Sequence, residues 1–152
     1  MSFNLMHEYK FMIDTSDGSA TPSYVPMAAG FTNATPGNNE QISQDNYLDG
    51  SGFSTSDVIG AQQVITFTGH RKFGDVAQDY IFGKTYVVGT ARRTKFQFTD
   101  PEGTMIECPC TIANIQNFGG DAGAKAEVSV EIHLNGIPTV TPPSGGSTEL
   151  NY

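Results

Sequence analysis

The sequence predicts a mostly β domain: an antiparallel β-sandwich or barrel with one short flanking α-helix and a long projecting hairpin loop. Alternation is the first observation behind this prediction. Apolar residues occupy every second position from 126 to 134, which is the period of a strand with one buried face. The second observation is the composition, which suits short strands and turns better than helices. The 152 residues include 17 Gly, 8 Pro, 10 Phe and 6 Tyr, and no Trp.

Two extended segments are expected near the N-terminus. Residues 8–14 alternate, with Tyr9, Phe11 and Ile13 on one side. Residues 24–27 form the second segment, and Pro26 within it has no backbone N–H to donate, which favours the edge of a sheet.

A long polar region follows, from residue 33 to residue 60. Connections longer than about 12 to 15 residues are usually functional or disordered. Apolar residues flank a central Asp49-Gly50 turn signal, namely Ile42, Tyr47, Leu48, Phe53, Val58 and Ile59. This spacing predicts a projecting hairpin, which needs a partner because it cannot bury its own aromatic side chains.

The one helix is expected after a strand over residues 64–70. Asp75 is suited to cap its N-terminus, Gln78 stands at the spacing of a capping box, and Gly83 ends it. The expected apolar stripe consists of Val76, Ala77, Tyr80 and Ile81. A helix of about two turns is not stable alone, so it must pack on a sheet.

Strands joined by turns are expected in the rest of the domain. Strand character returns at residues 86–88 and 92–98, and the turn sequence Asp100-Pro101-Glu102-Gly103 leads into alternating residues 106–112. A Gly-rich loop then precedes the last strand.

After Pro138 the chain is rich in Pro, Gly, Ser and Thr and is not expected to pack. We therefore expect one domain over residues 1–140 and a flexible C-terminal arm over residues 141–152.

Charge and hydropathy exclude several classes of protein. Eight basic against sixteen acidic residues give a formal charge of −8, which argues against capture of nucleic acid by phosphate neutralisation. No run of about 18 apolar residues and no signal-peptide pattern is present, so synthesis in a cytoplasm is expected.

No cofactor, metal or enzymatic activity is expected. Cys108 and Cys110 alternate in a strand and are predicted to be core residues, because no further ligands stand at zinc spacing. The acidic stretch 45–52 lacks two ligand positions of a calcium loop. No Ser or Cys stands in a recognisable motif with His and Asp.

Two basic clusters stand out against the acidity. They contain Arg71 and Lys72, and Arg92 and Arg93. One interpretation is a solvated strand end. The other is charge pairing with acidic residues of a second copy, which would set the register between subunits.

The order of these elements resembles the major tail tube proteins of long-tailed bacteriophages. The resemblance covers most of residues 9–139 and is most specific at 41–53, with its Tyr-Leu-Asp core, at 98–103 and at 127–138. It implies a structural virion protein that polymerises as stacked hexameric rings into the tail tube, the conduit for DNA ejection. The implied location is the virion tail, after synthesis in the bacterial host cytoplasm.

The resemblance also implies partners and surfaces. The protein would bind itself, and would meet tape measure, tail terminator and baseplate or tip proteins, while DNA passes without specific binding. The projecting hairpin would contact the adjacent ring, and we assign that contact to Ile42, Tyr47, Leu48, Asp49 and Phe53. An acidic lumen would repel phosphate, and Glu127 and Glu131 on the polar face of the last strand are the candidates to line it.

Two alternatives remain at this point. The inner tube of a contractile injection or secretion machine would share the fold and the ring. A β-sandwich binding module of a virion or cell surface would instead use exposed aromatic residues, and the absence of Trp argues mildly against it.

Overall fold

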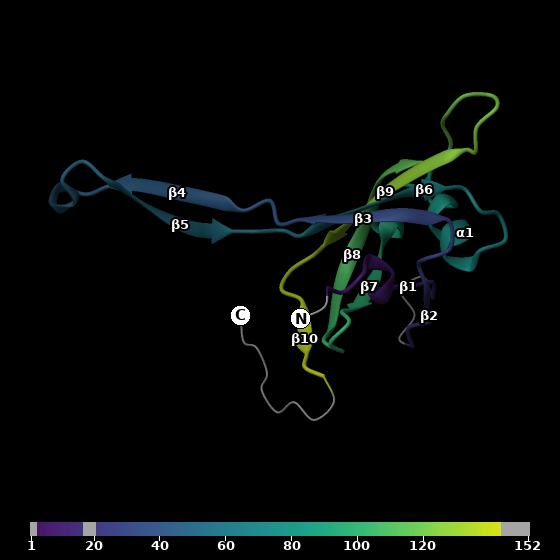
Figure 1. Cartoon of the computed structure of the whole chain (residues 1–152), viewed down its shortest axis with the longest axis horizontal. Coiled ribbons are helices and arrows are strands. Elements are labelled where there is room, and N and C mark those ends of the chain that lie inside the picture. Colours follow the sequence, from purple (N-terminus) through teal and green to yellow (C-terminus); the bar gives the residue numbers. More distant parts are fainter. Residues whose placement is uncertain (1–2, 17–20, 144–152) are drawn as a thin grey trace.

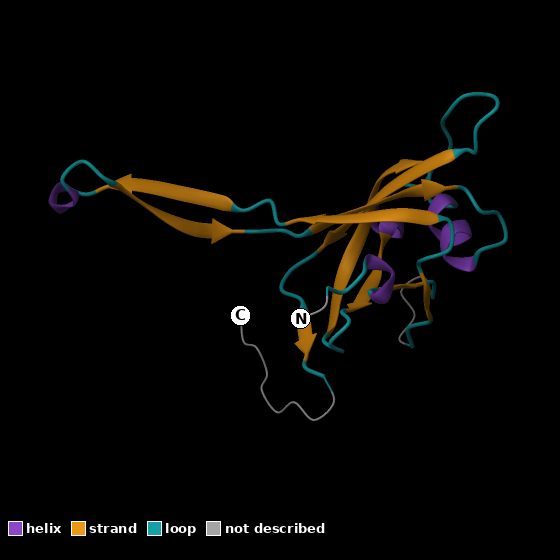
Figure 2. Cartoon of the chain, viewed as in Figure 1, coloured by secondary structure: helices purple, strands orange, loops and turns teal. Residues whose placement is uncertain are grey.

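The computed structural model of the protein describes residues 3–16 and 21–143, and within them it is mostly β with one α-helix (Figures 1 and 2). The strands are β1 (Lys10–Asp14), β2 (Tyr24–Pro26), β3 (Phe31–Gly37), β4 (Gln41–Asn46), β5 (Ser54–Gly60), β6 (Val64–His70), β7 (Arg93–Thr99), β8 (Met105–Gln116), β9 (Glu127–Leu134) and β10 (Thr139–Thr141). The helix is α1 (Val76–Phe82), and the short 3-10 helices are η1 (Met6–Glu8), η2 (Leu48–Gly50) and η3 (Gly89–Arg92).

Eight strands form one antiparallel sheet in the order β2-β1-β7-β8-β9-β6-β3, with β10 paired to β8 beside this path. The sheet is strongly curved but not closed, because β2 and β3 stand at its two ends (Figure 1). The expected β-sandwich is confirmed in this open form, and the hairpin β4–β5 makes a separate two-stranded sheet.

Curvature places the two halves of the sheet face to face around an aromatic core. Phe67 of β6 contacts Phe11 of β1 and Phe96 of β7, with ring centroids 5.1 and 5.9 Å apart. Neither β1 nor β7 is hydrogen bonded to β6. The alternation that predicted the last strand is also confirmed, because the buried side chains of β9 are Val128, Val130, Ile132 and Leu134.

The helix α1 is anchored to the sheet by an amide side chain. Asp75 caps it as expected, accepting a hydrogen bond from the backbone N of Gln78 at 3.1 Å. The Gln78 side chain is fully buried. Its Nε2 donates to the carbonyl oxygens of Ala29 and His70 at 3.0 and 2.9 Å, and its Oε1 accepts from the Lys72 N–H at 2.7 Å. Gln78 therefore ties α1 to β6 and to the β2–β3 loop.

The predicted apolar stripe of α1 is partly wrong, because the helix buries the face that carries Gln78. Val76 is exposed, whereas Ala77, Gln78, Ile81 and Phe82 are buried. Close packing at this point also needs glycine, since a side chain at Gly69 would strike the backbone of Gly30 and Phe31.

Three expectations about segment boundaries are wrong. The polar stretch from residue 33 to 37 belongs to β3, which pairs with β6. Residues 86–88 form no strand, because no neighbouring strand is there to pair with them. Residues 139–141 pack as β10 against residues 105–107 of β8, so the regular structure extends past Pro138. Residues 144–152 of the expected C-terminal arm lie outside the described residues.

Candidate assembly interface

The hairpin β4–β5 extends away from the curved sheet, on the side opposite α1 (Figure 1). Its strands pair from Asn46↔Ser54 to Gln41↔Gly60, and η2 forms the tip between them. The expectation of a long projecting hairpin is thus confirmed. An isolated two-stranded hairpin is marginally stable in water, so this segment gains from contact with another surface.

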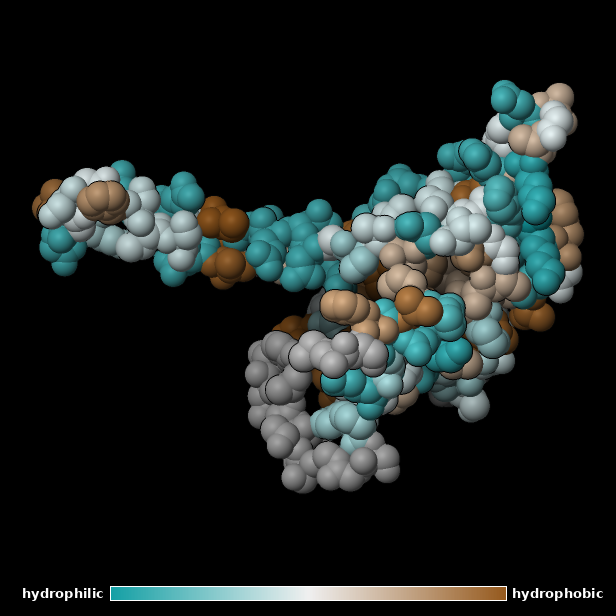
Figure 3. Space-filling view, viewed as in Figure 1, coloured by the Kyte–Doolittle hydropathy of each residue, from teal (hydrophilic) through white to brown (hydrophobic). Residues whose placement is uncertain are grey.

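Apolar side chains of the hairpin point into solvent. Leu48 at the tip is fully exposed and Phe53 is 78% exposed. Ile42 and Val58 are directly opposed across the pair, which places both on one face of the ribbon. Figure 3 shows brown, apolar patches on the projecting arm. The residues assigned to the inter-ring contact therefore lie together on the arm and are uncovered in the subunit.

The hairpin carries charge of one sign. Between residues 38 and 62 the chain has four acidic residues, Glu40, Asp45, Asp49 and Asp57, and no Lys, Arg or His. Half of the formal charge of −8 thus resides on the projecting arm. A surface that receives this arm is expected to be basic and apolar, because charge complementarity steers and orients association.

The hairpin tip is held by hydrogen bonds within itself. The backbone oxygen of Tyr47 accepts from Gly50 N, and the oxygen of Gly50 accepts from Phe53 N, both at 3.0 Å. Ser54 Oγ donates to Asn46 Oδ1 at 2.6 Å where the strands begin. The tip is therefore shaped before any partner binds, which lowers the entropy cost of association.

The four basic candidates divide into two kinds. Arg71 is largely buried, and its guanidinium pairs with Asp79 at 3.0 Å. Arg92 donates to the backbone oxygens of Val87, Thr85 and Ile112 at 2.7, 3.1 and 3.2 Å. Both arginines therefore serve contacts within the subunit. Lys72 and Arg93 are exposed. The prediction of charge pairing between subunits therefore rests on these two residues.

Glu127 and Glu131 lie on the polar face of β9, away from the aromatic core. Glu131 accepts hydrogen bonds from Asn114 Nδ2 at 2.8 Å and pairs with His133 Nε2 at 2.9 Å. These contacts, that of Asn114 first, lower the pKa of Glu131 below its ordinary value. The same polar face also carries Arg93, which stands in register with Thr111 and His133. This face of the sheet therefore bears both acidic and basic side chains.

Sequence reasoning missed an exposed apolar surface around α1. Phe73, Tyr86 and Val88 are 81%, 88% and 84% exposed, and Val76 joins them. The apolar run 86–88 was predicted to be a strand. One signal pointed elsewhere: the run lies between the helix-ending Gly83 and Gly89, and glycines on both sides favour turns.

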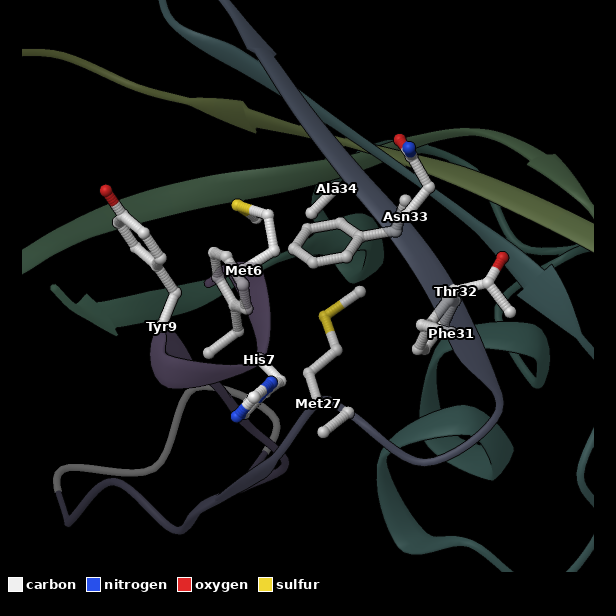
Figure 4. Close-up of a pocket in the computed structure, with 11 residues that line it drawn as sticks. Met6, His7, Tyr9, Met27, Phe31, Thr32, Asn33 and Ala34 are labelled. Atoms are coloured by element: carbon white, nitrogen blue, oxygen red, sulfur yellow. The ribbon is translucent and has the colours of Figure 1, made fainter. Parts of the chain in front are cut away.

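A pocket of about 280 Å³ lies where β1 and η1 face β3, at the gap that keeps the sheet open (Figure 4). Its lining is mostly apolar and includes Met6, Tyr9, Met27 and Phe31, together with His7. In the described part of the chain no group of three or more His, Cys, Asp or Glu side chains could hold a metal ion. Cys108 and Cys110 are buried, and burial raises the pKa of the Cys110 thiol to about 12.

Solved structures with the same fold come from gene transfer agent particles and from the SPP1 tail tube. A chain in the tail of an empty gene transfer agent particle, refined with C6 symmetry, matches with a TM-score of 0.73 at 15% identity, covering 91% of this chain and 99% of that one. A chain of the native gene transfer agent virion gives 0.67 at 14% identity, with 91% and 99% covered. The SPP1 tail tube gives 0.60 at 14% identity, with 91% and 78% covered. The chain has the tail tube fold.

The match to the tail chain takes in at least part of the projecting arm. A match over 91% of 152 residues leaves about 14 residues outside it, fewer than the 20 residues from Gln41 to Gly60. No protein-family model and no curated protein sequence matches the chain. No helix among the described residues is long and apolar enough to cross a membrane.

Proposed function

We propose that the protein is the subunit of a phage-type tail tube, a virion protein that polymerises as stacked hexameric rings around a channel for DNA ejection. The observation that carries the proposal is the match to a chain of a C6-symmetric tail, at a TM-score of 0.73 over 99% of that chain. In this role the protein performs no catalysis. Its partners are other copies of itself, with tape measure, tail terminator and baseplate or tip proteins at the ends of the tube.

The open sheet supports this assembly. Its outer strands β2 and β3 are each paired on one side only within the described residues. β3 spans seven residues, and an unpaired edge of this length invites strand pairing with another chain. Joining the sheets of neighbouring subunits around a ring would remove these edges, as closure does in a barrel.

Negative-stain electron microscopy of the concentrated protein tests the proposal directly. We expect rings with six-fold symmetry and tubes of uniform diameter. A monodisperse monomer at every concentration, measured by light scattering, would contradict the proposal and favour a binding module.

The lumen is proposed to include Glu127 and Glu131. Reversing both to Lys raises the charge of each subunit by four, about 24 per ring of six, so the wall would attract phosphates instead of repelling them. We expect intact tubes and at least about tenfold slower DNA release from particles built with this variant, with the delay relieved by salt.

The control is the double variant Glu102→Lys with Asp121→Lys, which changes the charge equally in exposed turns. Ejection at the normal rate from the Glu127 and Glu131 variant would show that these carboxylates lie away from the channel.

A further inference from the structure

The segment that contains α1 is the most basic part of the chain. Five of its eight basic residues lie between 71 and 93, against two acidic ones, which leaves a formal charge of +3 in a chain of −8. Exposed apolar side chains lie among them. The name α1 surface is used below for Lys72, Phe73, Val76, Tyr86 and Val88, all of which are exposed.

Internal contacts hold the α1 surface in shape from both ends of the helix. On one side, the guanidinium of Arg71 stacks on Phe73 at 4.1 Å and on Phe82 at 5.1 Å from the ring centroids. On the other side, Arg92 binds the backbone oxygens of Thr85 and Val87, which fixes the exposed 86–88 segment. The Arg71 guanidinium thus joins Phe73, before the helix, to Phe82, the last residue of the helix, and the 86–88 segment follows Phe82 after three residues. Preorganised apolar side chains bind at low entropy cost.

The hairpin complements this surface in both charge and hydropathy. It carries four acidic residues and no basic ones, and it exposes Tyr47, Leu48 and Phe53. The hairpin and α1 lie at opposite ends of the molecule (Figures 1 and 3). The two surfaces cannot meet within one subunit, so their complementarity points to contact between copies.

We propose that the hairpin tip of one subunit docks on the α1 surface of another copy of the chain, in the adjacent ring. Tyr47, Leu48 and Phe53 pack against Phe73, Tyr86 and Val88, while Asp45 and Asp49 face Lys72. A contact between two different surfaces at opposite ends of a molecule is heterologous and propagates into an open polymer, as a tube requires. This inference rests on the proposed function and names the surface that receives the arm.

The test separates the two halves of the contact. A receiver-null variant carries Lys72→Glu, Tyr86→Ser and Val88→Ser, all at exposed positions that leave the core intact. A donor-null variant has residues 47–53 replaced by a short Gly-Ser turn. We expect each variant alone to melt like the wild type and to form no tubes. Mixed together, they should form a bounded complex by light scattering, because only one pairing remains and it cannot propagate.

The matched control is Lys125→Glu with Phe118→Ser and Ile137→Ser, the same kinds of change at exposed positions elsewhere. It should form normal tubes. A second arm exchanges charges: Lys72→Glu should reduce elongation about tenfold, and adding Asp49→Lys should restore it.

The outcomes distinguish the inference from the proposed function. Normal tubes from the receiver-null variant, or no complex in the mixture, would overturn the docking surface and leave the tube role standing. Failure of the wild-type protein to form rings or tubes would overturn both.

Discussion

Replacing residues 47–53 by a short Gly-Ser turn is expected to leave a soluble, folded subunit that no longer elongates into tubes. No residue from 28 to 64 belongs to the buried apolar core of the described chain, which passes from Met27 directly to Ile65. The replaced side chains are exposed, so the free energy of unfolding should change by less than about 1 kcal/mol and the melting temperature by only a few degrees. Elongation should be lost because aromatic anchors carry most of the energy of an interface.

Thermal melts of the unassembled subunit beside electron microscopy provide the measurement. A matched control replaces residues 121–124 of the β8–β9 loop by Gly and Ser, which alters another exposed loop and should leave the tubes unchanged. Normal tubes from the hairpin variant would rule out the inter-ring contact. Loss of a cooperative melt would mean that the segment covers the domain's own core.

Phe67→Ala is expected to cause the largest loss of stability. Phe67 is 1% exposed and contacts Phe11, Phe31 and Phe96, which come from three other strands. Truncating a buried Phe to Ala typically costs about 3–5 kcal/mol, since it removes buried area and leaves a cavity. Single domains are stable by only about 5–15 kcal/mol, so the melting temperature should fall by on the order of 10 °C.

Denaturant unfolding at concentrations below assembly isolates this effect, because assembly itself stabilises the folded subunit by mass action. Phe118→Ala makes the same chemical change at a side chain that is exposed, and it should cost less than about 0.5 kcal/mol. Equal losses from the two variants would contradict the position of Phe67 at the centre of the core.

Local patterns predicted the elements whose geometry depends on their own residues. Alternation identified β9 and β6, since a strand with one buried face shows its period wherever it pairs. Asp75 marked the start of α1, because a cap needs only the backbone three residues ahead. The Asp49-Gly50 turn signal, flanked by apolar residues with no core to join, predicted the projecting hairpin.

Other features depend on contacts between distant parts of the chain. β3 is polar and contains Pro36, so its sequence favours a loop, and pairing with β6 makes it a strand. Gln78 is a polar residue on a short helix, and only the approach of Ala29 and His70 makes its burial favourable. The run 86–88 has strand propensity but no strand beside it to accept its hydrogen bonds.

The sequence alone determined a mostly β domain with one capped helix and an acidic, apolar hairpin, because periodicity, capping and charge are written in neighbouring residues. Only the tertiary structure decided how the basic residues are used. Arg71 and Arg92 hold the surroundings of α1 in place, while Lys72 remains exposed beside α1 and Arg93 is exposed on the polar face of the sheet. The reason is physical: a side chain's charge is fixed by its chemistry, but its burial and its partners depend on which distant segments the fold brings against it.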